Sequence, residues 1–569
     1  MKYYLFIITG PSGCGKTTLL KNLDKDFRHD SGRWVKAEKL STRSPRKGEH
    51  DSGGYWDVNT PPITPEDTPE KIADKKKQMA IDIREKCDVI YYMNNELYGF
   101  NTRSICNQLT KEHVAIVLSD LGVIKTLKEN SNLRDRIVTL YISSSVDSAQ
   151  LTDVWLGRYQ DFQGNKIGEK LDKTKTKDVA ETLEEVKRNI EYLTELKDKI
   201  ITDDSKGYDL FFKEFYPAIM NLYNCSYDLM PDGDSYKVRV DRLKNFYYKY
   251  IIDIGLFNHV ILNYFDSTDK PENEQMSRQA ASLIDYLEEQ ASKGTPITFD
   301  SESRPKDAIF FVCAAPKSGK RILQKNLTIM SGDQIHNVPK AALRESKGEY
   351  EKDNAMKAII TDENKSVHKP FLDEDKAAYD EYKENREACL KLIKEAPNKY
   401  MKHAYEAQLE EIEAAERKRW EEAKAHFPSQ YRDWVWRFHG KYYGVNTGEI
   451  SSYSKENRER EGKPVIPVIM ISNMNELDEA YKRYPRRLVP VFMTFVATDG
   501  ANAKFHTQQV GEGKMYRTIE EAQATIEEIK AIKEAYYDNI GKFRHVLLNS
   551  GIEEDLHDQI INLVRLYHN

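Results

Sequence analysis

The stretch Gly10-Pro11-Ser12-Gly13-Cys14-Gly15-Lys16-Thr17-Thr18 directly follows an apolar run at residues 3–8. It matches the P-loop pattern G-x-x-x-x-G-K-[ST], in which glycines let backbone N–H groups converge on a phosphate. In this pattern the lysine reaches the β and γ oxygens and the next hydroxyl faces Mg²⁺. A helix expected from residue 19 onward directs its positive N-terminus at the same anion. We therefore predict a site for ATP and Mg²⁺ made by Gly10, Ser12, Gly13, Cys14, Gly15, Lys16, Thr17 and Thr18, with Thr17 as the metal ligand.

Length and composition limit the possible classes of protein. A chain of 569 residues should hold more than one domain, since single cores stop growing at about 250–300 residues. We expect a cytoplasmic protein without a membrane anchor or signal peptide, because no apolar run approaches the roughly 20 residues that cross a bilayer. The six cysteines lack C-x-x-C spacing, which argues against a zinc site and a disulfide framework. Lysine plus arginine (86) nearly balances aspartate plus glutamate (92), so nucleic acid is neither implied nor excluded as a partner.

The chain contains the same unit twice. Residues 308–321 repeat the strand and loop of residues 4–17 position by position, and residues 433–450 repeat residues 88–105 with identical spacing. Both halves also carry an apolar strand that ends in Ser plus a small polar residue, at residues 114–120 and 465–473. These matches predict a tandem duplication.

The segment Ser41-Thr42-Arg43-Ser44-Pro45-Arg46-Lys47-Gly48-Glu49, followed by Tyr55, resembles the T-x-R-x-x-R-x-G-E…Y signature of guanylate kinases. The P-loop variant GPSGCGKTT is also similar to theirs. Two arginines three residues apart form a doubly cationic edge suited to one phosphate. The resemblance implies that Arg43, Arg46 and Tyr55 hold the phosphate of GMP and that Glu49 orients the site. It also implies a phosphate contact by Tyr98 and places Asp120 near the base and the metal.

The resemblance extends to a mobile lid. In guanylate kinases a helical segment brings arginines onto the transferred phosphoryl group. Arg158, and Arg188 within the helical stretch 179–196, occupy similar places and are the implied catalytic residues together with Lys16. Residues 200–204 look like the last strand of the family's sheet.

Two departures from the family bear on function. Val89 stands where guanylate kinases carry the glutamate that reads guanine, with Asp88 one step away, so the preferred base is open. The second half is weakened for catalysis, because Ala314 replaces the first P-loop glycine, Arg321 replaces the metal-facing Thr, and Asn473 replaces Asp120. Its segment 438–444 nevertheless resembles the acceptor-binding segment of the family, which leaves nucleotide binding without turnover open.

We predict two P-loop α/β units with mostly parallel sheets flanked by helices. Residues 1–225 would form the active guanylate-kinase-like domain, 226–304 a helical connector, and 305–569 a degenerate domain with an inserted helical arm at about 373–425. The predicted function is ATP-dependent phosphoryl transfer to a nucleoside monophosphate, GMP or dGMP, and the arm is a candidate surface for a protein partner. The alternatives are a P-loop kinase that acts on a modified nucleotide or on DNA or RNA, and a non-catalytic scaffold.

Overall fold

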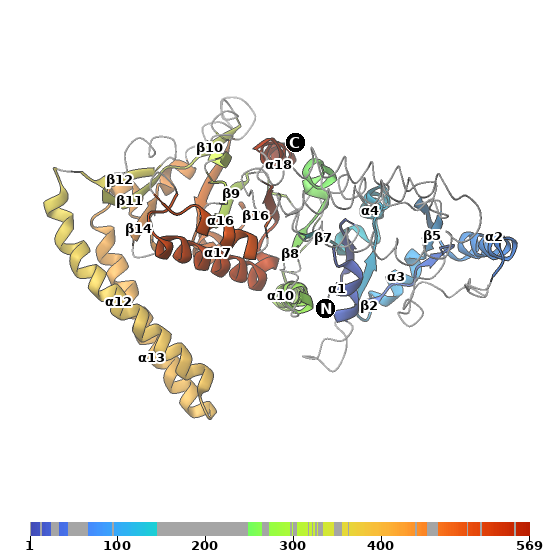
Figure 1. The fold of residues 1–569 in the computed structure, drawn as a ribbon, viewed down its shortest axis with the longest axis horizontal. Coiled ribbons are helices and arrows are strands. Elements are labelled where there is room, and N and C mark those ends of the chain that lie inside the picture. The colour runs from blue at the N-terminus through green and yellow to red at the C-terminus, as the bar shows by residue number, and fades with distance from the viewer. Residues whose placement is uncertain are drawn as a thin grey trace, which may run out of the picture. The chain divides into compact units, whose positions relative to one another are not determined.

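The structure is a computed structural model. It describes residues 2–11, 14–23, 34–43, 67–93, 96–144, 248–264, 272–295, 297, 299, 304–305, 307–316, 318–320, 322–324, 327, 334–345, 356–361, 363–438, 441–451, 465–497, 499–511, 515–550 and 553–568. The fold is α/β, with two five-stranded parallel sheets flanked by helices, as the sequence predicts (Figure 1). Among the described helices, none has an apolar stretch long enough to cross a membrane.

The first large sheet has the strand order β2-β6-β1-β7-β8, with all neighbours parallel. Every residue of the central strand β1 is buried, which explains its continuous apolar sequence. The strands are β1 (Leu5–Thr9), β2 (Trp34–Lys36), β6 (His113–Val117), β7 (Ile137–Ser144) and β8 (His259–Asn263). The helices of this part are α1 (Lys16–Leu23), α3 (Thr102–Gln108), α4 (Leu121–Glu129) and α10 (Glu272–Ser292).

The predicted connector 226–304, with helical patterns expected at 236–265 and 277–292, contains the helix α10 and also the strand β8. The prediction treats residues 236–265 as helical, but residues 259–263 pair in parallel with β7 and form the edge of the first sheet. A short apolar run buried on both faces lacks the alternation that marks a strand, so its period does not separate strand from helix. Residues 200–204, predicted as the last strand, lie outside the described residues.

A small antiparallel sheet of order β3-β5-β4 carries the segment that precedes Arg43. Its strands are β3 (Leu40–Ser41), β4 (Val89–Met93) and β5 (Glu96–Phe100). Ile83 of helix α2 (Pro69–Lys86) packs on Leu40 and Leu97, so a small apolar core fixes the helix to the sheet.

The second half repeats this arrangement. Its large sheet has the order β10-β15-β9-β16-β17 and its small sheet the order β12-β11-β14-β13. The strands are β9 (Ile309–Ala314), β10 (Ile335–Asn337), β11 (Lys340–Glu345), β12 (Met356–Ile360), β13 (Trp434–Phe438), β14 (Lys441–Val445), β15 (Ile466–Ile471), β16 (Leu488–Phe495) and β17 (His545–Asn549). The helices include α15 (Glu476–Arg483), α16 (Asp499–Gln508), α17 (Ile519–Asn539) and α18 (Glu553–His568).

Strand register confirms the duplication. Ile8 of β1 faces Val117 of β6, and Val312 of β9 faces Met470 of β15. Lys16 follows Ile8 by eight residues, and Lys320 follows Val312 by eight residues. The loops of the two halves therefore leave their sheets at the same place.

The chain divides into two compact units, residues 1–304 with 490–566 and residues 305–489 with 567–569. This division cuts across the predicted domain 305–569. Within the first unit, Tyr250 donates its hydroxyl to the Val546 carbonyl at 2.6 Å, and Tyr536 donates to the Val260 carbonyl at 2.7 Å. Each tyrosine precedes a short 3₁₀ turn and a strand of the same sequence pattern, so the contacts are reciprocal, as in an isologous dimer interface.

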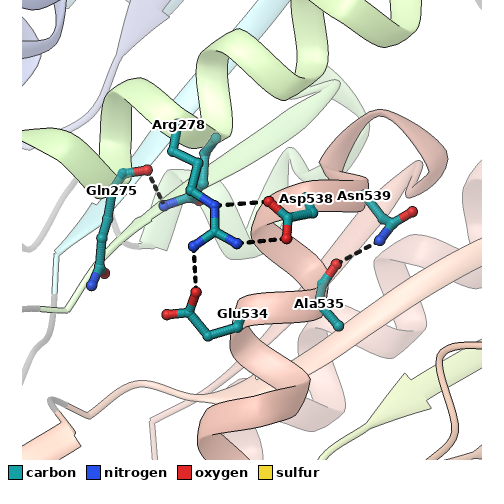
Figure 2. Close-up of polar contacts among 7 residues, drawn as sticks. Gln275, Arg278, Glu534, Ala535, Asp538 and Asn539 are labelled. Carbon is teal, nitrogen blue, oxygen red and sulfur yellow. Dashed lines mark hydrogen bonds and ion pairs between the residues drawn. The ribbon is translucent and has the colours of Figure 1, made fainter. Parts of the chain in front are cut away.

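Arg278 of α10 adds an ionic contact inside the same unit. Its guanidinium binds both carboxylate oxygens of Asp538, at 2.8 and 2.5 Å, and also contacts the Glu534 carboxylate (Figure 2). This bidentate geometry joins α10 to α17.

The predicted helical arm is present as the antiparallel pair α12 (Lys365–Glu395) and α13 (Lys399–Lys424) (Figure 1). Its base is anchored by Arg437 of β13, which is 5% exposed and binds Asp375 of α12 at 2.5 Å and Glu416 of α13 at 3.0 Å. Tyr442 donates to Asp375 at 2.9 Å. The arm is therefore held to the small sheet of its own half by buried charge.

Candidate functional site

The phosphate-binding loop begins at the carboxyl end of β1 and depends on two glycines. Gly10 has φ +145°, and a Cβ there would lie 2.7 Å from the Ile142 carbonyl oxygen. Gly15 has φ +97°, and a Cβ there would lie 2.9 Å from the terminal methyl of Met276. Both positive φ values favour glycine, and at Gly10 the backbone carbonyl also leaves no room for a side chain. The structure thus explains why the P-loop pattern has glycine at both positions.

Lys16 lies across this loop. Its ammonium donates to the carbonyl of Gly10 at 2.8 Å and to that of Pro11 at 2.6 Å. Lys16 is also the first residue of α1, so its charge and the free N–H groups of the helix lie on the same side of the loop. Ser12 and Gly13 lie outside the described residues.

Cys14 is a buried residue of the loop rather than a surface thiol. Burial raises the pKa of its thiol, and the Lys16 charge opposes that rise. Asn263, at the end of β8, donates its side-chain amide to the Cys14 carbonyl at 2.9 Å. Sequence reasoning missed Asn263; the signal was its place at the end of the segment FNHVILN, which recurs as FRHVLLN at residues 543–549.

Two residues predicted to lie near the metal have different environments. Thr17 is exposed, and Thr18 beside it is half-buried. Asp120 follows β6, the neighbour of β1, and its carboxylate accepts from the Val123 N–H at 3.0 Å as the N-cap of α4. A Mg²⁺ ion fits the exposed Thr17 hydroxyl, whereas Asp120 also has a capping role. Among the described residues, no group of three or more His, Cys, Asp or Glu is arranged to hold a metal.

The small sheet brings Arg43 to this edge of the first sheet. Thr42 bridges the strands, because its hydroxyl donates to Glu96 at 2.6 Å and accepts from the Leu97 N–H at 2.9 Å. The Arg43 N–H donates to the Ser41 hydroxyl at 3.1 Å. These bonds fix the backbone from which the Arg43 side chain extends.

Tyr98 is only 3% exposed and stacks on Tyr91 with 5.5 Å between ring centres. Both rings lie against the ammonium of Lys39, which donates to the Val117 carbonyl at 3.1 Å. Lys39 therefore joins the small sheet to the carboxyl edge of the large one. No motif points to this lysine, and sequence reasoning missed it.

The other predicted residues of the acceptor site and the lid are not part of this geometry. Arg46, Glu49, Tyr55, Arg158 and Arg188 all lie outside the described residues. Their roles stay predictions.

Asp88, the carboxylate next to Val89, has a structural partner. It accepts from the Thr102 N–H at 2.7 Å and from the Thr102 hydroxyl at the start of α3. In the second half Asp433 accepts from the Thr447 hydroxyl at 3.0 Å in the same way. The aspartate at this position therefore binds the first residue of a helix in both halves.

The equivalent loop of the second half keeps its lysine but not its surroundings. Lys320 donates to the Ala314 carbonyl at 3.2 Å and to the Ser472 hydroxyl. Gly319 retains φ +101°, while Ala314 carries a side chain at the position of Gly10. Arg321 lies outside the described residues.

Comparisons with known proteins support the coarse class. The model of the Rad17 P-loop domain family matches residues 1–62. No curated protein matches the chain. A crystal structure of guanylate kinase from Anaplasma phagocytophilum matches at 16% identity, over 29% of this chain and 68% of that chain, with a TM-score of 0.19; a likeness at that level carries no argument about activity. The first repeat is a P-loop NTPase-type domain, and the class implies nucleotide binding.

Proposed function

We propose that the first repeat transfers the γ-phosphoryl group of ATP to a nucleoside monophosphate, with GMP and dGMP as the first candidates. The observation that carries the proposal is the bond from Lys39 to the Val117 carbonyl, which holds the small sheet beside the P-loop edge. This arrangement brings a second cationic segment, which includes Lys39 and Arg43, next to the phosphate loop. A hydrolase needs one anion site, whereas a transferase must hold a donor and an acceptor together.

The residues of this chain have separable roles in the proposed reaction. ATP, when bound, supplies the phosphoryl group, and Mg²⁺ would be held by the Thr17 hydroxyl. The loop N–H groups and Lys16 bind the donor phosphates and balance the charge that develops during transfer. To do so, Lys16 exchanges its bonds to the Gly10 and Pro11 carbonyls for phosphate oxygens.

Arg43 would bind the acceptor phosphate, with Arg46 and Tyr55 as predicted partners. Arg158 and Arg188 are proposed to close over the transferred group and exclude water. The choice of base is left to the assay, because Asp88 is engaged by Thr102 and Val89 has no polar side chain.

A second candidate is ATP hydrolysis without an acceptor. The Rad17 P-loop family match favours it, because that match covers the loop and the first strands. Lys16, Thr17 and Asp120 are the residue types that P-loop NTPases use for it. Under this reading, phosphate release would not depend on any nucleoside monophosphate.

The test measures ADP and phosphate release by the full-length protein, with ATP and Mg²⁺, against GMP, dGMP, the other nucleoside monophosphates and a single-stranded oligonucleotide. Lys16→Met is the inactive control and Lys320→Met the matched control in the second repeat. Lys16-dependent ADP formation that requires GMP or dGMP supports the kinase. Equal phosphate release with and without acceptor favours the ATPase, and activity on the oligonucleotide alone favours a polymer substrate. ATP binding without ADP formation in the presence of any acceptor favours a non-catalytic scaffold.

A further inference from the structure

A buried lysine lies at the phosphate edge of the first repeat outside any motif. Lys39 is 5% exposed, and its ammonium donates to the Val117 carbonyl at 3.1 Å. The ring centres of Tyr98 and Tyr91 lie 4.9 and 5.5 Å from the same nitrogen. Burying an ammonium group is costly unless nearby groups stabilise its charge. Aromatic faces and one carbonyl provide part of that stabilisation.

Other cations lie near Lys39. Val117, which binds Lys39, faces Ile8 on the neighbouring strand, and Lys16 binds the Gly10 carbonyl two residues beyond Ile8. Parallel neighbours are about 4.8 Å apart, so both ammonium groups lie along one short edge of the sheet. Arg43 follows Lys39 by four residues. Burial, and then the charges of Arg43 and Lys16, lower the pKa of Lys39 to about 7.

The second repeat contains the same lysine. Leu40 pairs with Gly99, and Ala341 with Gly444, so Lys39 and Lys340 are equivalent by register. Lys340 is 7% exposed and donates to the Met470 carbonyl at 2.6 Å. A lysine–carbonyl hydrogen bond thus joins the small sheet to the large sheet in both repeats. We call this hydrogen bond the joint.

The surroundings of the two lysines differ. Burial is the main cause that lowers the pKa of each lysine to about 7. The neighbouring charge that adds to this effect is that of Lys320 for Lys340, and those of Arg43 and Lys16 for Lys39. Arg344, equivalent to Arg43, donates to the Glu345 carbonyl. A lysine that only joins two sheets does not need two further cations near it, but an anion site does.

We propose that Lys39 is an additional phosphate-binding residue of the first repeat, which with Lys16 and Arg43 forms a three-cation site for a phosphate monoester dianion. The inference rests on the proposal that the first repeat contains the functional site, but it does not require that the site transfers a phosphoryl group. Lys39 attracts the anion through its positive charge, whereas Lys340 only joins the two sheets of its repeat.

The proposal has a pH signature. Lys16 from the P-loop, Arg43 after β3, and the rings of Tyr91 and Tyr98 face the ammonium. An anion among these cations raises the pKa of Lys39 above its value in the free protein. Below about pH 7 the lysine is already charged; above it, binding must take up a proton, and affinity falls by up to about tenfold per pH unit.

The experiment measures the dissociation constant of sulfate, which stays a dianion across the range, by calorimetry on the full-length protein between about pH 6 and pH 8.5. We expect the affinity of the wild type to fall above pH 7. Lys39→Met should bind about ten- to a hundredfold more weakly at pH 6, without that fall. Lys39→Arg should keep the affinity and lose the pH dependence, because arginine stays charged. In Lys16→Met the fall in affinity should begin at higher pH. The reason is that the Lys16 charge, which lowers the pKa of Lys39, is removed.

Lys340→Met is the matched control, since it removes the same joint from the other repeat. It should bind sulfate as the wild type does, and its loss of thermal stability should resemble that of Lys39→Met. A wild-type profile in Lys39→Met, an equal loss in Lys340→Met, or no sulfate binding by the wild type would overturn the proposal. Loss of phosphoryl transfer with an unchanged sulfate profile would count against the proposed function and not against this site.

Discussion

At the end of β1 the first repeat has a glycine with positive φ, a lysine across the loop and an arginine segment beside it. At the end of β9 the second repeat has Ala314 in place of the glycine, and Lys320 binds the Ser472 hydroxyl. Away from its loop, the second repeat buries Arg437 with two carboxylates under the helical arm, whereas the equivalent Tyr92 of the first repeat is 65% exposed.

The difference between the repeats is where each uses its charges. The first repeat gathers Lys16, Lys39 and Arg43 near the end of β1, where we propose that an anion binds, whereas the second uses Arg437 to hold its helical arm. Shared strand order therefore does not imply shared chemistry, because the fold only determines where a site can lie. Equivalent residues of the two repeats therefore serve as matched controls for one another.

The largest expected effect is on the stability of the second repeat. Arg437→Met leaves the Asp375 and Glu416 carboxylates buried without their partner, so it should lower the free energy of unfolding by about 3–5 kcal/mol. Tyr92→Met, at the equivalent exposed position, should change it by less than about 0.5 kcal/mol. Urea unfolding of both variants measures the difference. Equal effects would show that the buried network has no special role.

The next effect is on transfer. Lys16→Met removes the cation that faces the donor phosphates and should lower kcat by about 10²–10³-fold. Lys320→Met should leave kcat unchanged, because Ala314 and Arg321 replace the first loop glycine and the metal-facing Thr in its repeat. Initial rates of ADP formation measure both. An equal loss in the two variants would contradict the division of roles.

A third prediction concerns pH. Burial raises the pKa of Glu476 from 4.5 to about 7, although its carboxylate accepts from the Trp434 indole at 2.7 Å. A carboxyl whose folded pKa is raised favours the folded state at low pH and loses that contribution as pH rises from about 4.5 to 7. Glu476→Gln removes the titration, so its stability relative to wild type should improve by about 3 kcal/mol between pH 4 and pH 8.

The matched control is Glu479→Gln, a more exposed carboxylate on the same helix. Because burial, and only then the Glu479 charge, raises the pKa of Glu476, this variant should keep most of the wild-type slope of stability against pH. Parallel wild-type and Glu476→Gln curves from urea unfolding across this pH range would show that Glu476 does not titrate in it.

The smallest effect concerns the loop backbone. Gly10→Ala places a Cβ against the Ile142 carbonyl at a φ of +145° and should weaken ATP binding by about 1–3 kcal/mol. Ala314→Gly, the reciprocal change, should leave ATP binding unchanged and cost at most about 1 kcal/mol of stability. Calorimetric titration with ATP and Mg²⁺ distinguishes them. Wild-type affinity in Gly10→Ala would show that the loop tolerates a side chain.

The features that could be predicted from sequence alone are those that occur twice in the chain or that have a motif of closely spaced residues. The P-loop, the duplication and the helical arm all have this property, and strand register confirms the predicted equivalence of Tyr98 with Tyr443 and of Asp120 with Asn473. The fold class followed from the P-loop between a strand and a helix, together with its repetition in the second half.

The missed features depend on contacts between distant segments. The sequence of β8 fits a helix or a strand equally well, because four buried residues in succession show no period. Asn263 and Lys39 are single polar residues whose roles come from carbonyls 249 and 78 positions away. The reciprocal tyrosine bonds link residues nearly 300 positions apart. No local pattern specifies such pairs.

The account places phosphate binding in the first repeat, and the most direct test is the number of ATP sites per chain. Calorimetric titration of the full-length protein with a non-hydrolysable ATP analogue and Mg²⁺ should give one site, absent in Lys16→Met and retained in Lys320→Met. Two sites per chain, or one site that disappears in Lys320→Met, would contradict it.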